Sequence, residues 1–290
     1  TAKTPAMPSD HVPSDDEAAP DPTASPSELR TLCAEIAHAA GSFAHGQRRL
    51  LGAGSRAAHD TKSSDVDPVT EFDRATERLV VDRIRAARPH DSIVGEEGAD
   101  HQGRSGLEWH VDPIDGTVNF VYDLPGWCTP VAVLHDGRPV AGAIYAPVVD
   151  ELYTCALGEG ATINGTPIAV SDATDLATSL PATGFSYHLD GHRVAQAERI
   201  ARVLPRVRDI RRQGSAALDL AYVASGRVDA YFEEFIQSWD VAAGVLLVTE
   251  AGGTVSAFDG RPIDVTAPAG VVAATPALHD QFLTMVVESR

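Results

Sequence analysis

Apolar residues recur at helical spacing in two stretches near the start of the chain. The first runs from Leu29 to Phe43 and follows Ser27, a residue type that is favoured at a helix N-cap. The second follows Thr70 and Asp73, which together resemble a capping box with Asp in the place of Glu. The pattern predicts one helix from about residue 28 and a second from about residue 71 that ends before a proline, both in one layer.

From residue 91 onward the apolar segments become short, and turn sequences of the types Asp-Gly, Gly-Glu-Gly and Asn-Gly separate them. This spacing is typical of a meander and therefore predicts an antiparallel sheet. The expected strands are 92–95, 109–111, 130–134, 140–145, 152–156 and 168–170.

Beyond residue 178 strand-like and helix-like segments alternate. The expected strands are 179–182, 228–232, 253–256 and 271–274, and the expected helices are 194–203, 215–224, 239–251 and 277–288. An α+β half, 28–177, thus precedes an α/β half, 178–290, with no obvious linker between them, which predicts a single domain. Residues 1–27 are rich in Pro, Ser, Asp and Ala and almost lack large apolar side chains, so we expect a disordered tail there.

The charge balance is strongly acidic, with 41 Asp and Glu against 23 Lys and Arg and a formal net charge of −18. Such a surface repels nucleic-acid phosphates, so we expect no nucleic-acid partner. No apolar run approaches the roughly 20 residues that span a bilayer, and no secretory leader pattern opens the chain, so we expect no membrane association. Three scattered cysteines are too few for a disulfide framework and fit a cytoplasmic location.

The strongest chemical signal is the segment DPIDGT at residues 112–117, which directly follows a predicted strand. Gly116 permits a sharp turn there, so the carboxylates of Asp112 and Asp115 can converge on one point that the Thr117 hydroxyl can also face. Hard oxygen ligands at this density suit Mg²⁺ or Mn²⁺. For this segment alone, an ordinary turn capped by aspartate is an equally good interpretation.

Three further acidic segments lie where predicted elements begin or end. Glu96 and Glu97 follow the strand 92–95, and two adjacent glutamates repel each other unless a cation lies nearby. Asp240 and Asp73 each stand in the first turn of a predicted helix, where an acid is also favoured by the helix dipole alone. Because strand ends and helix starts gather at one edge of an α/β arrangement, a shared metal site is favoured over four separate turns.

Taken together, these segments resemble the inositol monophosphatase family. The motifs, in the order of the family, are KSSDVDPVTEFD at 62–73, GEE at 95–97, DPIDGTVNF at 112–120, GSAA at 214–217 and WDVAAG at 239–244. The resemblance implies a layered αβαβα sandwich, and this agrees with an α+β half followed by an α/β half.

The resemblance also implies roles for single residues. The implied metal ligands are Glu96, Asp112, Asp115, Asp240 and the carbonyl of Ile114, with Asp73 at a weaker third position. Among the implied catalytic residues, Glu96 and Thr117 orient the attacking water beside Asp115. The implied substrate contacts are Asp115, Gly116, Thr117, Gly214, Ser215, Ala216, Glu233 and Asp240. No metal ligand of the pattern is missing, which argues against an inactive relative.

The activity implied in this way is Mg²⁺-dependent hydrolysis of a phosphate monoester, with inositol 1-phosphate as the expected substrate. About two or three Mg²⁺ ions would neutralise the phosphate, activate a water and stabilise the leaving oxygen. A homodimer and inhibition by Li⁺ are implied as well. Fructose 1,6-bisphosphate, histidinol phosphate and a 3′-phosphoadenosine nucleotide are alternative substrates, and a non-catalytic partner-binding protein is the alternative from another class.

Several other polar residues have weaker interpretations. His110 is either an ordinary strand histidine or a residue that lies behind the metal ligands. Cys33 and Cys155 are expected in helix and strand cores, and Trp127 and Cys128 are expected to pack behind the segment DPIDGT. A basic cluster could attract a phosphorylated substrate, form a subunit contact or be a solvated face, and it comprises Arg206, Arg208, Arg211 and Arg212.

Overall fold

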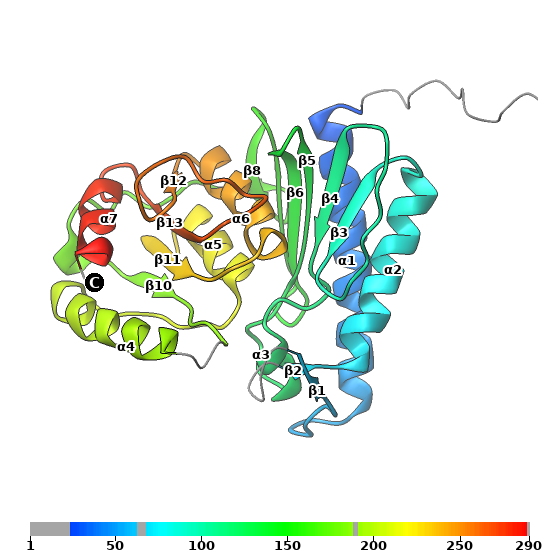
Figure 1. Cartoon of the computed structure of the whole chain (residues 1–290), viewed down its shortest axis with the longest axis horizontal. Coiled ribbons are helices and arrows are strands. Elements are labelled where there is room, and N and C mark those ends of the chain that lie inside the picture. Colours follow the sequence, from blue (N-terminus) through cyan, green and yellow to red (C-terminus); the bar gives the residue numbers. More distant parts are fainter. Residues whose placement is uncertain (1–23, 63–67, 188–190, 289–290) are drawn as a thin grey trace, which may run out of the picture.

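The two N-terminal helices, α1 (Pro26–Leu50) and α2 (Glu71–Ala87), form the outer layer on the right of Figure 1. The computed structural model describes residues 24–62, 68–187 and 191–288. The predicted tail therefore falls almost entirely on residues 1–23, outside the described part. Along the chain, the two helices are separated by a two-stranded antiparallel pair, β1 (Asp60–Thr61) and β2 (Pro68–Val69).

Both N-terminal helices begin with a capping box. At α1 the Ser25 hydroxyl accepts the backbone N–H of Glu28, and the Glu28 carboxylate accepts the backbone N–H of Ser25 at 2.8 Å. The predicted cap at Ser27 is therefore wrong, because Ser25 and Glu28 already satisfy the free N–H groups of the first turn. The box that the sequence predicts at Thr70 and Asp73 is confirmed at the start of α2.

The larger sheet has the strand order β3-β4-β5-β6-β7-β8-β9. Its strands are β3 (Ser92–Gly95), β4 (Leu107–Val111), β5 (Thr129–His135), β6 (Arg138–Ala146), β7 (Glu151–Ala156), β8 (Gly160–Ile163) and β9 (Thr166–Pro167). From β4 onward every pairing is antiparallel, which confirms the predicted meander, whereas β3 and β4 run parallel. The expected strand at 168–170 is wrong. The Val170 N–H donates to the Ala251 carbonyl at the end of a helix instead of to a neighbouring strand.

The smaller sheet has the order β10-β11-β13-β12, and only β10 and β11 are parallel. Its strands are β10 (Pro181–Thr183), β11 (Ala230–Glu234), β12 (Thr254–Ser256) and β13 (Gly270–Ala274). The associated helices are α4 (His192–Val203), α5 (Ala216–Ala224), α6 (Ser238–Glu250) and α7 (His279–Val287). The expected strand start at 228 is too early, because the N–H groups of Arg227 and Val228 still bond the Tyr222 carbonyl at the end of α5.

The layers follow one another as helices, sheet, helices, sheet and helices across Figure 1, which confirms the predicted αβαβα sandwich. Leu29 of α1, Ile84 of α2 and Trp109 of β4 share one core on the outer face of the larger sheet. Helices α5 and α6 fill the space between the two sheets. The outer face of the smaller sheet packs on α7, where Phe232 and Phe282 lie 5.8 Å apart between ring centroids.

The buried cysteines and the helix lengths can be compared with the expectations from the sequence. Cys33 and Cys155 are fully buried on α1 and β7, as expected. No helix within the described residues has the length and apolar content needed to cross a membrane.

The contact between α5 and α6 gives a test of the packing. A Cβ on Gly244 would lie 2.6 Å from the Cβ of Leu220, which is not the free end of a side chain, whereas a Cβ on Gly46 of α1 would meet no atom within 4 Å. Gly244→Ala should therefore lower the free energy of unfolding by about 1–3 kcal/mol despite the better helix propensity of alanine. Gly46→Ala should raise it by up to about 1 kcal/mol. Urea unfolding of both variants measures the two values, and equal stabilisation would contradict the packing argument.

Candidate active site

The candidate site begins where β3 and β4 end side by side. These two strands are parallel, and their last paired residues are Gly95 and Val111. The next residue on each strand is an acid, Glu96 on one and Asp112 on the other, so the parallel register brings the two carboxyl groups to the same edge. The Glu96 N–H donates to the Val111 carbonyl at 3.3 Å, which extends the pairing by one residue.

The turn that follows β4 is held by its own side chains. The Asp112 carboxylate accepts the Ile114 N–H at 2.8 Å, and the Thr117 hydroxyl donates to the Ile114 carbonyl at 3.0 Å. Gly116 has a φ of 97°, and a Cβ there would lie 2.8 Å from the carbonyl oxygen of Gly126, so only glycine fits. The turn leads into a short helix, α3 (Thr117–Val121), which the sequence analysis did not predict.

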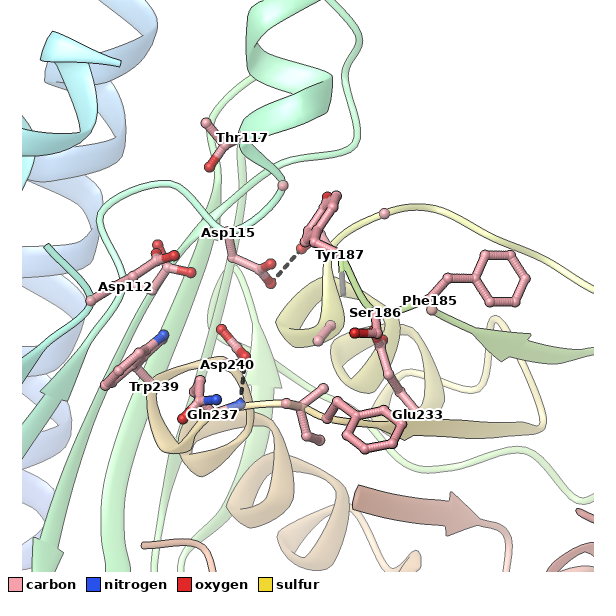
Figure 2. A pocket seen from close by; sticks show the side chains of 18 of the residues that line it. Asp112, Asp115, Thr117, Phe185, Ser186, Tyr187, Glu233, Gln237, Trp239 and Asp240 are labelled. Carbon is pink, nitrogen blue, oxygen red and sulfur yellow. Dashed lines mark hydrogen bonds between the residues drawn. The ribbon is translucent and has the colours of Figure 1, made fainter. Parts of the chain in front are cut away.

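Helix starts position the other two acids of the cluster. The Asp115 carboxylate accepts the Ser215 hydroxyl and the Ala217 N–H, both at 2.7 Å, at the N-terminus of α5. The Asp240 carboxylate accepts the Gln237 N–H at 2.7 Å in the first turn of α6. Figure 2 shows that the side chains of Asp115 and Asp240 point into the same space as that of Asp112.

The three aspartates form a dense anionic group. One carboxylate oxygen from each of Asp112, Asp115 and Asp240 lies within 4.8 Å of the others. Burial, followed by the repulsion of neighbouring acids, raises the pKa of Asp112 and of Asp240 well above the ordinary range, and burial raises the pKa of Asp115 to about 6. A cation would offset these costs, because it stabilises the ionised form of each acid.

Glu96 extends the acidic group and is only partly satisfied by a neighbouring lysine. The Lys62 Nζ lies 2.7 Å from Glu96 Oε1 and 2.5 Å from Glu97 Oε1, so Lys62 supplies a cation for the two adjacent glutamates. The other oxygen, Glu96 Oε2, is buried and has no hydrogen-bond partner among the described residues. Mg²⁺ and Mn²⁺ bind to carboxylate oxygen atoms, and here several carboxylates are clustered and one buried oxygen lacks a hydrogen-bond partner among the described residues. These residues therefore fit a divalent metal.

Asp73 is not part of this group of three aspartates, and it contacts the turn after β4 through Thr117. Its carboxylate accepts the Thr70 N–H at 2.8 Å, as the capping box requires, and its other oxygen lies 3.3 Å from the Thr117 hydroxyl oxygen. Burial raises the pKa of Asp73 to about 6. The structure therefore shows the helix-capping role directly, and the role as an outer metal ligand stays a prediction.

The remaining predicted residues line the same cavity, which has a volume of about 390 Å³. These are Gly214, Ser215, Ala216 and Glu233, together with Gly116 and Thr117. Glu233 comes from β11, and burial raises its pKa to about 7. A Cβ on Gly184 would lie 1.8 Å from its carboxylate, so the Glu233 side chain could keep this position only beside a glycine.

Ten of the residues that line the cavity were not predicted as site residues, among them Phe185, Tyr187, Arg212 and Phe235. Residues 188–190, which follow Tyr187, lie outside the described residues. Of the predicted basic cluster only Arg212 lines the cavity, with its guanidinium 5.7 Å from the Phe185 ring centroid. Arg211 instead pairs with an aspartate on its own loop, Asp209, at 2.6 Å.

His110 and Ser238 form a contact behind the acidic group. His110 is a buried strand histidine whose Nδ1 lies 2.8 Å from the Ser238 hydroxyl and whose Nε2 lies 2.7 Å from Glu108. Because a carboxylate only accepts, Nε2 carries the proton, and the Ser238 hydroxyl donates to Nδ1. His110 thus joins the strand of Asp112 to the helix of Asp240.

Cys128 and Trp127 pack behind the turn, as the sequence predicts. The Cys128 sulfur lies 3.3 Å from the Ser215 hydroxyl oxygen, and burial raises the thiol pKa well above its ordinary range. The Trp127 ring meets Phe120 edge to face at 5.1 Å between centroids. Because nucleophilic cysteines need a lowered pKa, Cys128 is a packing residue.

Comparisons with known proteins find related sequences. The sequence model described as "Inositol monophosphatase family" matches residues 26–290. An inositol-1-monophosphatase from Mycobacterium leprae (strain TN) is 42% identical over 276 residues, which cover 90% of this chain and 94% of that protein. A protein named Nus factor SuhB from Pasteurella multocida (strain Pm70) is 40% identical over 227 residues, which cover 78% of this chain and 85% of that protein.

A solved structure gives the same result in three dimensions. The extragenic suppressor protein SuhB from Bartonella henselae superimposes with a TM-score of 0.82 at 33% sequence identity, covering 89% of this chain and 98% of that one.

The crowding of acids predicts how stability depends on pH and metal. An acid with a raised pKa contributes its full stability only below its ordinary pKa, and this contribution is lost as the pH rises through the value in the folded protein. Without metal at about pH 8, Asp112→Asn should therefore raise the melting temperature, because one buried repelling charge is removed. It should also diminish the stabilisation that Mg²⁺ gives the unaltered protein.

Differential scanning calorimetry with EDTA and with Mg²⁺ measures both effects. The control is Asp136→Asn in the exposed turn between β5 and β6, which should change neither. If Asp112→Asn lowers the melting temperature of the metal-free protein and leaves the stabilisation by Mg²⁺ unchanged, Asp112 is not a metal ligand.

Proposed function

The chain belongs to the inositol monophosphatase family, and on that premise we propose that it hydrolyses phosphate monoesters with Mg²⁺ as its cofactor. The observation that carries the proposal is the group of buried carboxylates from Asp112, Asp115 and Asp240 at one end of the cavity. Without a cation that end would repel a phosphate dianion, and with divalent cations it would attract one.

In this proposal Glu96, Asp112, Asp115, Asp240 and the Ile114 carbonyl hold the metal ions, with Asp73 as an outer ligand. The bound cations would neutralise the phosphate and lower the pKa of a water at the site. The acids themselves are held ready for this task by Ile114, Ser215 and Gln237, whose N–H or O–H groups keep single oxygen atoms oriented. This leaves the opposite carboxylate oxygen atoms for the cavity.

Glu96 and Thr117 are the proposed pair that positions the attacking water. The Thr117 hydroxyl already donates its proton to the Ile114 carbonyl, so its oxygen is available to accept a hydrogen bond from a water. The carboxylate of Glu96 can accept the second proton of that water. The water oxygen would then form the new bond to phosphorus as one of its protons passes to Glu96, and the ester bond would break. The departing alkoxide would take one proton from solvent, which balances the proton held by Glu96.

The alcohol end of the substrate would contact Gly214, Ser215, Ala216 and Glu233. We propose inositol 1-phosphate as the substrate, which the relative named inositol-1-monophosphatase supports. Fructose 1,6-bisphosphate, histidinol phosphate and a 3′-phosphoadenosine nucleotide remain the alternative substrates.

Partner binding is a second candidate function, because one relative carries the name Nus factor. The two functions separate in one variant: Asp112→Asn should abolish hydrolysis, and it leaves the outer surface of the protein unchanged.

Glu96→Gln tests the proposed hydrolytic mechanism. The amide keeps the shape of the side chain, but it removes a carboxylate that positions the water mainly in the transition state. We expect kcat for inositol 1-phosphate with Mg²⁺ to fall about a hundredfold or more while KM stays within about threefold. The matched control is Glu97→Gln, which removes the neighbouring partner of Lys62 and should change kcat much less. A change in KM alone would reassign Glu96 to substrate binding, and no hydrolysis by the unaltered protein would refute the function.

A further inference from the structure

The backbone of Phe235 is unusual for its residue type. Its φ is 63°, in the left-handed region that side chains larger than Asn or Asp rarely adopt. The other non-glycine residues with positive φ in the described part of the chain are all Asp or Asn: Asp123, Asp136, Asp150 and Asn164. Phe235 is thus a strained residue directly after β11, and the strain calls for an explanation.

Packing in the core does not supply that explanation. The Phe235 side chain is 41% exposed, so its ring gains less from burial than the core phenylalanines do. Two contacts hold it in place: the Phe235 N–H donates to the Ala269 carbonyl at 3.2 Å, and the ring lies 4.1 Å from the ring of His192 at the start of α4. Both contacts fix the ring at the edge of the cavity, which it lines.

The cavity has two chemically different walls. The acids at one end would hold the phosphate through metal ions, and the wall around Glu233 faces the alcohol. Figure 2 shows Phe185, Tyr187 and Glu233 on the side opposite Asp112. Phe235 follows Glu233 by two residues and adds an exposed aromatic face to the part of the cavity where the alcohol would lie.

A cyclic polyol matches this surface. Its hydroxyl groups lie mostly around the rim of the ring and can bond to a carboxylate such as Glu233, whereas the C–H groups on each face are apolar. An aromatic ring carries partial negative charge on its face and therefore packs well against such C–H groups. An acyclic polyol has no continuous C–H face and gains less from the same contact.

We propose that Phe235 is a specificity-determining residue whose exposed ring packs against the C–H face of a cyclic polyol, so that the site prefers phosphate esters of cyclic over acyclic polyols. The inference rests on the proposed phosphatase function and adds a residue to it that the family motifs did not indicate. It also explains why a strained phenylalanine stands at the edge of the cavity.

The test compares kcat/KM for inositol 1-phosphate and glycerol 1-phosphate, with Mg²⁺, in the unaltered protein and in Phe235→Gly. Glycine adopts the left-handed backbone freely, so the melting temperature should rise. The preference for the cyclic ester should fall by about five- to tenfold, mainly through KM. Phe235→Tyr keeps the ring and should keep the preference.

The matched control is Asp136→Gly in the turn between β5 and β6, which relieves a left-handed backbone far from the cavity in sequence and should leave the preference unchanged. If the unaltered protein hydrolyses both esters and Phe235→Gly leaves their ratio unchanged, or if Phe235→Tyr loses the preference, the inference is wrong and the phosphatase function stands. If the unaltered protein hydrolyses neither ester, both fail.

Discussion

The mutual repulsion of buried carboxylates is the constraint on which this structure depends. Asp112, Asp115 and Asp240 approach within 4.8 Å of one another, and burial makes each of them harder to ionise. Such a group persists only where the surrounding fold over-determines it. Here one oxygen of each acid is fixed by a backbone N–H or a hydroxyl group.

The layered architecture provides these fixed positions. The parallel pair β3 and β4 brings Glu96 and Asp112 to one edge of the larger sheet, and the middle layer brings in the N-termini of α5 and α6. The close contact of Gly244 with Leu220 sets the distance between those two helices. Packing inside the sandwich and the spacing of the acids are therefore parts of the same arrangement. His110 adds a direct link between β4 and α6 through Ser238.

The two ends of the cavity show different relations between strain and function. At the acidic end strain is electrostatic, and it is distributed over Asp112 and Asp115 of the segment DPIDGT and over Asp240. At the other end, near Glu233, strain is conformational and concentrated in Phe235, whose residue type gives no warning of a left-handed backbone. Both kinds of strained residue line the same cavity. Strain gathers in this way at functional sites, where it is not selected for folding stability.

The sequence by itself determined most of the helices and strands and the acidic segments, because periodicity and turn residues act over short distances, whereas the αβαβα layering was implied only by the family resemblance. It missed the parallel pairing of β3 with β4, the antiparallel neighbours of β13, the strands β8 and β9 and the short helix α3. Tertiary structure alone decided that Lys62 neutralises Glu96 and that Arg212 and Phe235 line the cavity. These contacts join residues far apart in the chain, and no local pattern specifies which distant side chain will fill a given space.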